Sequence, residues 1–134
     1  MYSEAEAHLA NLDFCGSRAL RRAYLLLVLA AERAGFHTGP KDTARELKIR
    51  DRIGMQPFLV LVGEVELQFC VRPPAIAAQP RLAGEAENRF EGRLISGSGD
   101  IRIRVRSVAD AEDIVDWLFP DGSFSPGYGE RRSA

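Results

Sequence analysis

The sequence contains few of the residues that build metal centres and disulfide frameworks. Its 134 residues include two cysteines, Cys15 and Cys70, and two histidines, His8 and His37. A zinc site needs a cluster of cysteine and histidine ligands, and a disulfide-rich domain needs more cysteines. We therefore expect reduced thiols, no metal and no cofactor.

Long apolar stretches and a basic N-terminal region are also missing. The longest apolar run spans residues 23–31, whereas a membrane-spanning helix needs about 20 apolar residues. Residues 1–4 contain no basic side chain of the kind that opens a signal peptide. We expect no contact with a membrane and a cytoplasmic location.

A large net charge is absent as well. The formal net charge is −1, so the chain as a whole has no electrostatic attraction to nucleic acid. The basic residues are nevertheless unusual, since sixteen are arginines and two are lysines. Arginine suits carboxylate and phosphate ligands, although a GC-rich coding bias explains the excess more simply.

Three helices are predicted, over residues 3–14, 17–34 and 108–119. Ser17 and Ser107 are suitable N-caps, and Gly16 and Gly35 are suitable terminators. The second helix is apolar on two sides, because Leu25, Val28 and Leu29 lie opposite its main apolar stripe. A helix of this kind is covered twice. We favour cover by the first helix over cover by a second subunit.

Alternating and continuous apolar runs predict four strands, at residues 45–53, 57–62, 65–72 and 100–106, with a two-residue turn at Gly63-Glu64. Residues 75–98 show weak periodicity and are expected to form a long connection with a short helical piece near 85–90. Grouped strands favour one α+β domain over residues 1–120. We expect a four-stranded, mostly antiparallel sheet with two to three helices packed on one face, followed by a disordered tail at 121–134.

The segment Gly97–Ser107, followed by Asp110 and Asp113–Val115, resembles the end of a family of uncharacterised bacterial domains often described as "predicted transport protein". The resemblance extends over residues 36–119 and includes the hairpin from Phe58 to Val71. One departure is that Leu94–Ser96 stands where the family tends to have an aromatic residue. The resemblance implies a binding or accessory role and supplies no catalytic residues.

The most suggestive residues are basic side chains expected on the open face of the sheet. They are Lys48, Arg50, Arg52, Arg102, Arg104 and Arg106. Such a face could bind phosphates or an acidic partner. The simpler interpretation is a solvated ladder in which the arginines pair with Glu64 and Glu66. No aromatic residues for base stacking alternate with these arginines, and the acidic stripe Asp110, Asp113 and Asp116 is expected to lie away from them.

Two further hypotheses use other residues. A homodimer or protein-partner interface would use Leu25, Val28, Leu29 and Trp117. A metal-dependent nuclease would use Asp51, Glu64 and Glu66, but Leu67 stands where a lysine is needed, and we consider this class improbable. We predict no catalytic residue. The sequence favours a non-enzymatic binding or interaction module, potentially homodimeric, with a nucleic-acid-binding accessory domain as the alternative.

Overall fold

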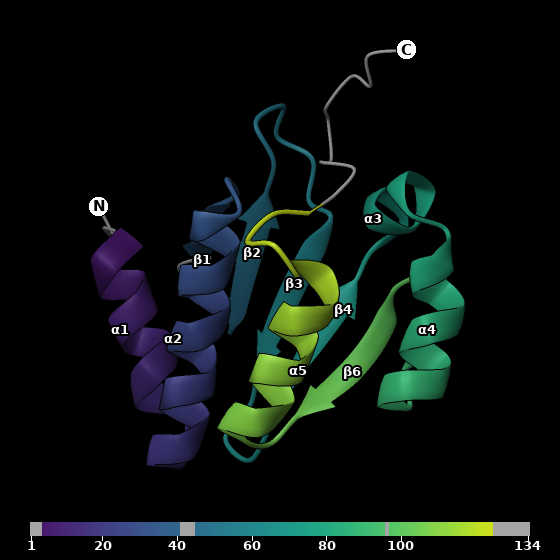
Figure 1. Cartoon of the computed structure of the whole chain (residues 1–134). Coiled ribbons are helices and arrows are strands. Elements are labelled where there is room, and N and C mark those ends of the chain that lie inside the picture. The colour runs from purple at the N-terminus through teal and green to yellow at the C-terminus, as the bar shows by residue number, and fades with distance from the viewer. Residues whose placement is uncertain (1–3, 41–44, 96, 125–134) are drawn as a thin grey trace.

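The chain folds into an antiparallel sheet with helices on one side (Figure 1). The computed structural model describes residues 4–40, 45–95 and 97–124. The strands are β1 (His37–Pro40), β2 (Glu46–Arg50), β3 (Phe58–Val62), β4 (Leu67–Val71), β5 (Arg93–Leu94) and β6 (Ile101–Val105). Their order across the sheet is β1-β2-β3-β4-β6-β5, and every neighbouring pair is antiparallel.

The helices are α1 (Glu4–Phe14), α2 (Arg18–Arg33), α3 (Pro73–Ala78), α4 (Arg81–Phe90) and α5 (Val108–Leu118). The predicted α+β class is confirmed, but the predicted numbers of strands and helices were too low. The four expected strands overlap β2, β3, β4 and β6, and the three expected helices overlap α1, α2 and α5. None of the helices in the described ranges is long and apolar enough to cross a membrane.

The missed elements are short and carry weak patterns. β5 has two residues, β1 reads His-Thr-Gly-Pro, and the apolar side of α4 buries only Leu82 and Ala86. The expected long connection over residues 75–98 therefore contains most of α3, all of α4 and β5. These elements place a helix and an edge strand beside β6, and both contribute residues to the candidate site.

All four predicted strands were longer than the observed ones, and the difference is largest for β2. β2 ends at Arg50 because residues 51–55 form a turn, in which Asp51 Oδ1 accepts the N–H groups of Ile53 and Met55 at 3.0 and 2.9 Å. Ile53, which the predicted strand included, is 72% exposed. The register pairs Val62 with Leu67, so four residues join β3 to β4 and the predicted two-residue turn was wrong.

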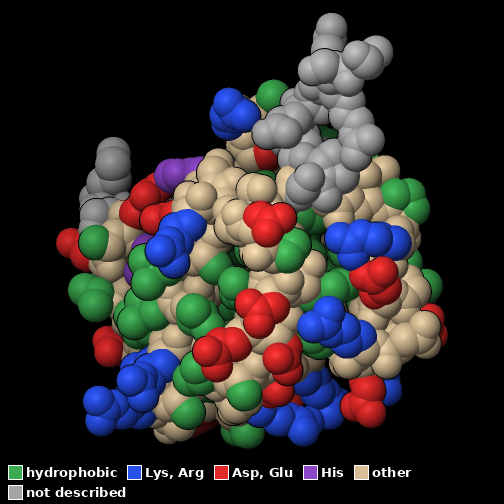
Figure 2. All heavy atoms as spheres, in the orientation of Figure 1, with side chains coloured by type: hydrophobic (Ala, Val, Ile, Leu, Met, Phe, Trp, Pro, Cys, Tyr) green, Lys and Arg blue, Asp and Glu red, His purple; other side chains and the backbone are tan. Residues whose placement is uncertain are grey.

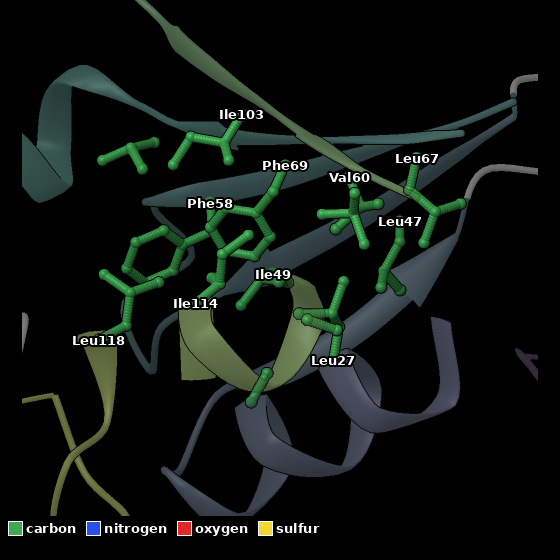
Figure 3. Close-up of a cluster of buried hydrophobic side chains, with 14 of the residues drawn as sticks. Leu27, Leu47, Ile49, Phe58, Val60, Leu67, Phe69, Ile103, Ile114 and Leu118 are labelled. Carbon is green, nitrogen blue, oxygen red and sulfur yellow. The ribbon is translucent and has the colours of Figure 1, made fainter. Parts of the chain in front are cut away.

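The core lies between one face of the sheet and helices α2 and α5 (Figure 3). One row of the register runs from Leu47 through Val60 and Phe69 to Ile103, and all four side chains are buried. Leu27, Ile114 and Leu118 meet this row from the two helices. Because successive side chains of a strand point to opposite faces, the intervening residues project from the other face, over which no described helix packs.

The segment after α5 continues into the core. Phe124 is 2% exposed, and its ring lies 5.3 Å from Phe58 and 6.3 Å from Phe36, measured between ring centroids. The predicted disordered tail was therefore wrong for residues 121–124, because Phe124 completes an aromatic cluster. Residues 125–134 lie outside the described ranges.

Helix α1 packs against β1 and α2 through a polar network. Asn11 Nδ2 donates to Tyr24 Oη at 3.0 Å and to the carbonyl oxygen of Glu46 at 3.2 Å, and Tyr24 Oη lies 2.7 Å from His8 Nδ1. Leu25 and Leu29 remain 43% and 58% exposed. The expectation that α1 covers these two leucines was wrong, because α1 contacts the neighbouring side of α2, at Tyr24.

Candidate functional site: an arginine hollow at the edge of the sheet

The open face of the sheet carries polar and basic side chains around a small apolar centre. One row of the register runs from Lys48 through Leu59 and Cys70 to Arg102. Cys70 is fully buried although it lies on this face, since its longer neighbours rise above it. Burial raises the pKa of the Cys70 thiol to about 11, so the group is a neutral thiol near neutral pH and not a ready nucleophile.

The six basic residues predicted on this face do not form one patch. Two strands separate Lys48 and Arg50 on β2 from Arg102 on β6, which corresponds to about 14 Å for three strand spacings. Arg52 lies in the turn after β2. The alternation correctly predicted that the basic side chains of β2 and β6 share the open face. The order of the strands, however, keeps those of β2 apart from those of β6.

The arginines of β6 instead join others from α4 and β5 around a hollow of about 850 Å³. We call this the arginine hollow and define it by five of its lining residues, Arg89, Arg93, Arg102, Arg104 and Arg106. The rest of the lining comes from β4, the end of α4, the flanks of β5, β6 and the start of α5: Gln68, Asn88, Phe90, Glu91, Ile95, Ile103, Asp110 and Asp113. The hollow therefore surrounds the outer edge of β6.

The hollow exists because β5 is short and because β6 leads directly into α5. Ser107 Oγ accepts the N–H of Asp110 at 3.1 Å, and Asp110 Oδ2 accepts the N–H of Arg106 at 2.9 Å. Ser107 is thus the N-cap that the sequence predicted, and the two bonds together form a variant of the capping box. It turns the chain over the core immediately after β6 and brings the first turns of α5 to one wall of the hollow.

Only part of the arginine charge is neutralised. Glu66 Oε1 lies 3.1 Å from Arg106 Nε, and Glu66 Oε2 lies 3.6 Å from Arg104 Nε. The ladder interpretation is thus correct for Glu66, whereas Glu64 forms no ion pair within the described part of the chain. Among the same residues, Arg89, Arg93 and Arg102 pair with no carboxylate, and the Nε of Arg102 is buried with no hydrogen-bond partner.

Arg93 and Arg102 are directly opposite one another in the β5–β6 pair. Like charges at directly opposite positions of a sheet destabilise it, and no acidic side chain of the described ranges pairs with either. Stability alone does not favour this arrangement. An anionic ligand bound between the two guanidinium groups would make their interaction stabilise the folded chain instead of destabilising it.

Acidic residues of α5 lie closer to the arginines than predicted. Asp110 and Asp113 line the hollow, so the expectation that the acidic stripe lies away from the arginine face was wrong for these two residues. Figure 2 shows acidic side chains gathered over α5 and basic side chains along the rim below it. The hollow thus lies at a boundary between charges of opposite sign.

The four predicted interface residues separate into two groups. Val28 and Trp117 are 8% and 4% exposed and belong to the core. The indole N–H of Trp117 donates to Glu85 Oε1 at 2.8 Å, and its ring lies 4.8 Å from that of Phe90. Leu25 and Leu29, one helical turn apart on α2, are the two that remain on the surface.

The nuclease hypothesis would need carboxylates close together. Asp51 follows β2 at the end of the sheet where Ile49 pairs with Phe58, and Glu66 precedes β4 at the opposite end. Within residues 4–40, 45–95 and 97–124, no three histidine, cysteine, aspartate or glutamate side chains are grouped so that they could hold a metal ion. The residues named for this chemistry do not converge.

Sequence reasoning missed Arg93 because β5 carries no pattern of its own, and it missed Arg89 although the helical piece expected near residues 85–90 contains this residue. No protein-family model matches the chain, and no curated protein or solved structure matches it significantly.

Proposed function

We propose that the protein is a non-enzymatic binding module that holds an acidic partner in the arginine hollow. The observation that carries the proposal is the opposition of Arg93 and Arg102, with Arg89 beside the same hollow and no carboxylate paired with any of the three in the described ranges. Guanidinium groups form their strongest hydrogen bonds with carboxylates and phosphates. A bound anionic group would remove the repulsion and occupy the free donors.

An acidic protein segment fits this hollow better than nucleic acid does. Sheets that bind single-stranded nucleic acid usually present aromatic side chains for base stacking, and the aromatic residues of β3 and β4, Phe58 and Phe69, lie in the core. Phe90 lines the hollow, but its ring packs against Trp117, with an angle of 48° between the ring planes. The five arginines keep nucleic acid as a second candidate. The resemblance of residues 36–119 to an uncharacterised domain family also implies a binding role.

The test is a titration of labelled hexaglutamate, and separately of a short single-stranded DNA, followed by fluorescence anisotropy at two salt concentrations. We expect the peptide to bind, and Arg93→Ala and Arg102→Ala each to weaken binding at least tenfold. Arg22→Ala, which changes an exposed arginine of α2 outside the hollow, is the matched control and should bind as the unmodified protein does.

Two results would decide against the proposal. Failure of the unmodified protein to bind either ligand at low salt would reject a binding function for the hollow. Tighter binding of DNA than of peptide, lost in the same two variants and steeply weakened by salt, would establish the second candidate in its place.

Self-association is a separate proposal and rests on α2. Leu25 and Leu29 are exposed one turn apart, and a second subunit could cover them. Light scattering of the unmodified protein and of Leu25→Glu/Leu29→Glu tests this proposal. A dimer that the double change converts to a monomer supports it, whereas a monomer at high protein concentration rejects it.

A further inference from the structure

The outer edge of β6 is paired with a strand along only part of its length. β5 pairs with β6 at two positions, Leu94 with Ile101 and Arg93 with Arg102. The chain then leaves the sheet at Gly92, whose N–H donates to the carbonyl oxygen of Ala86. No strand in the described ranges lies beside Ile103–Val105 on this side of β6.

The direction of the backbone groups on this edge follows from the hydrogen bonds around it. The carbonyl oxygen of Asp100 accepts the N–H of Ile95 on the β5 side. In an antiparallel strand, every second residue directs its backbone N–H and C=O groups to the same edge. Arg102, Arg104 and Arg106 therefore also direct their N–H and C=O groups outward. Arg102 is paired with β5 and the N–H of Arg106 with Asp110. Arg104 is left with both backbone groups unpaired by any described residue.

The opposite edge of the sheet is protected, which makes the open stretch of β6 distinctive. α1 lies beside β1, where Glu4 Oε1 contacts His37 Nε2 at 2.8 Å. Proteins usually cover or shorten their edge strands because unpaired backbone groups attract other strands. Helix α4 contacts β6, but no strand of the described ranges pairs with β6 beyond β5, and this stretch lines the arginine hollow, whose volume of about 850 Å³ can hold a peptide segment.

We propose, on the basis of the function proposed above, that the acidic partner is an extended segment that adds to the sheet as an antiparallel strand beside Ile103–Val105. Strand addition of this kind obtains affinity from backbone hydrogen bonds and specificity from alternate side chains. A residue opposite Arg104 would exchange both backbone hydrogen bonds with it. Its side chain would project from the open face, where Arg102, Arg104 and Arg106 lie.

The alternation also defines the composition of the partner. Side chains on one face of the added strand meet guanidinium groups and are best acidic. Side chains on the other face lie beside Ile103 and Phe90 and are best apolar. The preferred partner is thus a segment in which acidic and apolar residues alternate.

A second copy of this chain is a poor occupant. Antiparallel pairing of two β6 strands about Arg104 would place Arg104 opposite Arg104 and Arg102 opposite Arg106 of the other copy. Like charges opposite one another destabilise a pair of strands. The charge that repels a second copy attracts an acidic segment.

The experiment uses the full chain and an eight-residue peptide with blocked ends that alternates glutamate and valine. Amide hydrogen exchange measured by NMR should show exchange at Arg104 slowed more than tenfold at saturating peptide. A peptide N-methylated at its glutamates, whose amides would face β6, should bind at least tenfold more weakly. A peptide N-methylated at its valines, whose amides would face away, is the matched control and should keep its affinity.

The outcomes separate this inference from the function on which it rests. Binding of hexaglutamate and of both N-methylated peptides with equal affinity, with exchange at Arg104 unchanged, would overturn strand addition and leave the binding module intact. Absence of binding by every acidic peptide would overturn both. Protection of the Arg104 amide without peptide, together with a doubled mass, would replace the acidic segment by a second copy.

Discussion

The side chain of Tyr24 links two polar residues of α1 through one hydroxyl group. Asn11 Nδ2 donates to this hydroxyl, and His8 Nδ1 lies 2.7 Å from the same hydroxyl oxygen. Burial lowers the pKa of His8 against smaller opposing effects of Glu32 and Glu4, so folding favours the neutral imidazole.

The lowered pKa of His8 predicts a pH dependence of stability. The unfolded chain, in which the pKa of His8 is near its ordinary value of 6.5, binds a proton more readily than the folded chain does. The free energy of unfolding should therefore decrease as pH falls below about 6.5 and the unfolded state takes up the proton. In His8→Gln, the amide oxygen can accept from Tyr24 at every pH, so this part of the pH dependence should disappear. Urea denaturation at pH 7.5 and 5.5 measures the difference, and an equal loss in both proteins would contradict the assignment.

A second prediction at this scale concerns the opposed arginines. Arg93→Glu replaces the like-charged Arg93–Arg102 pair by an opposite-charged one, which should raise the free energy of unfolding by about 0.5 kcal/mol. The same change should abolish peptide binding, because it places a carboxylate in the hollow. Opposite effects on stability and binding would mark Arg93 as a functional position. A loss of both would indicate that Arg93 supports the fold.

At the scale of elements, the turn between β3 and β4 is held by the connection between α1 and α2. The N–H of Gly16 donates to the carbonyl oxygen of Glu64 at 2.8 Å, and a Cβ atom at position 16 would collide with that oxygen. The turn must then move away from this connection. Since Glu66 of this turn pairs with Arg104 and Arg106, its position also affects the hollow.

Gly16→Ala should therefore lower the free energy of unfolding by about 1–3 kcal/mol. Gly84→Ala is the matched control, because this glycine lies in α4 with open space around its Cα. It should raise the free energy of unfolding by about 0.5–1 kcal/mol, as alanine is the better helix former. Thermal denaturation compares the two, and similar shifts in the same direction would contradict the close approach.

The elements also show which parts of the structure the sequence could predict. Strands β2, β3, β4 and β6 carry β-branched and aromatic residues in regular patterns, so they were predicted apart from their ends. β1 and β5 are held by pairing with a neighbour and carry no pattern of their own. Arg102, Arg104 and Arg106 were therefore predicted as a candidate surface, whereas Arg93 lay in an expected connection. Periodicity gives the face of a strand but not its neighbours, which is why Lys48 and Arg50 were grouped with distant residues.

At the scale of the whole molecule, a net charge of −1 conceals a separation of charge. Acidic side chains gather over α5 and arginines surround the edge of β6 (Figure 2). A local field of this kind directs the approach of charged partners even when the net charge is small. Asp113 lies at the boundary between the two regions and would repel an acidic ligand in the hollow.

Asp113→Asn should therefore increase the affinity for hexaglutamate by about two- to threefold at low salt, with a smaller effect at high salt because ions screen the interaction. Asp116→Asn removes an exposed acid of the same helix that does not line the hollow, and it should have less effect. Anisotropy titrations of both variants measure this. Equal effects would place the ligand elsewhere on the molecule.

The position of Phe124 has a consequence for how the chain folds during its synthesis. Strands β1–β4 leave the ribosome early, after α2, but the part of their apolar face that α5 and Phe124 cover stays open until these have followed. Phe124 contacts Phe36 and Phe58 from far along the chain, and contacts between distant segments slow folding because long loops must close first. We expect the nascent sheet to remain exposed until nearly all of the described chain has emerged. During that interval chaperones, and not the native core, would keep it from aggregating.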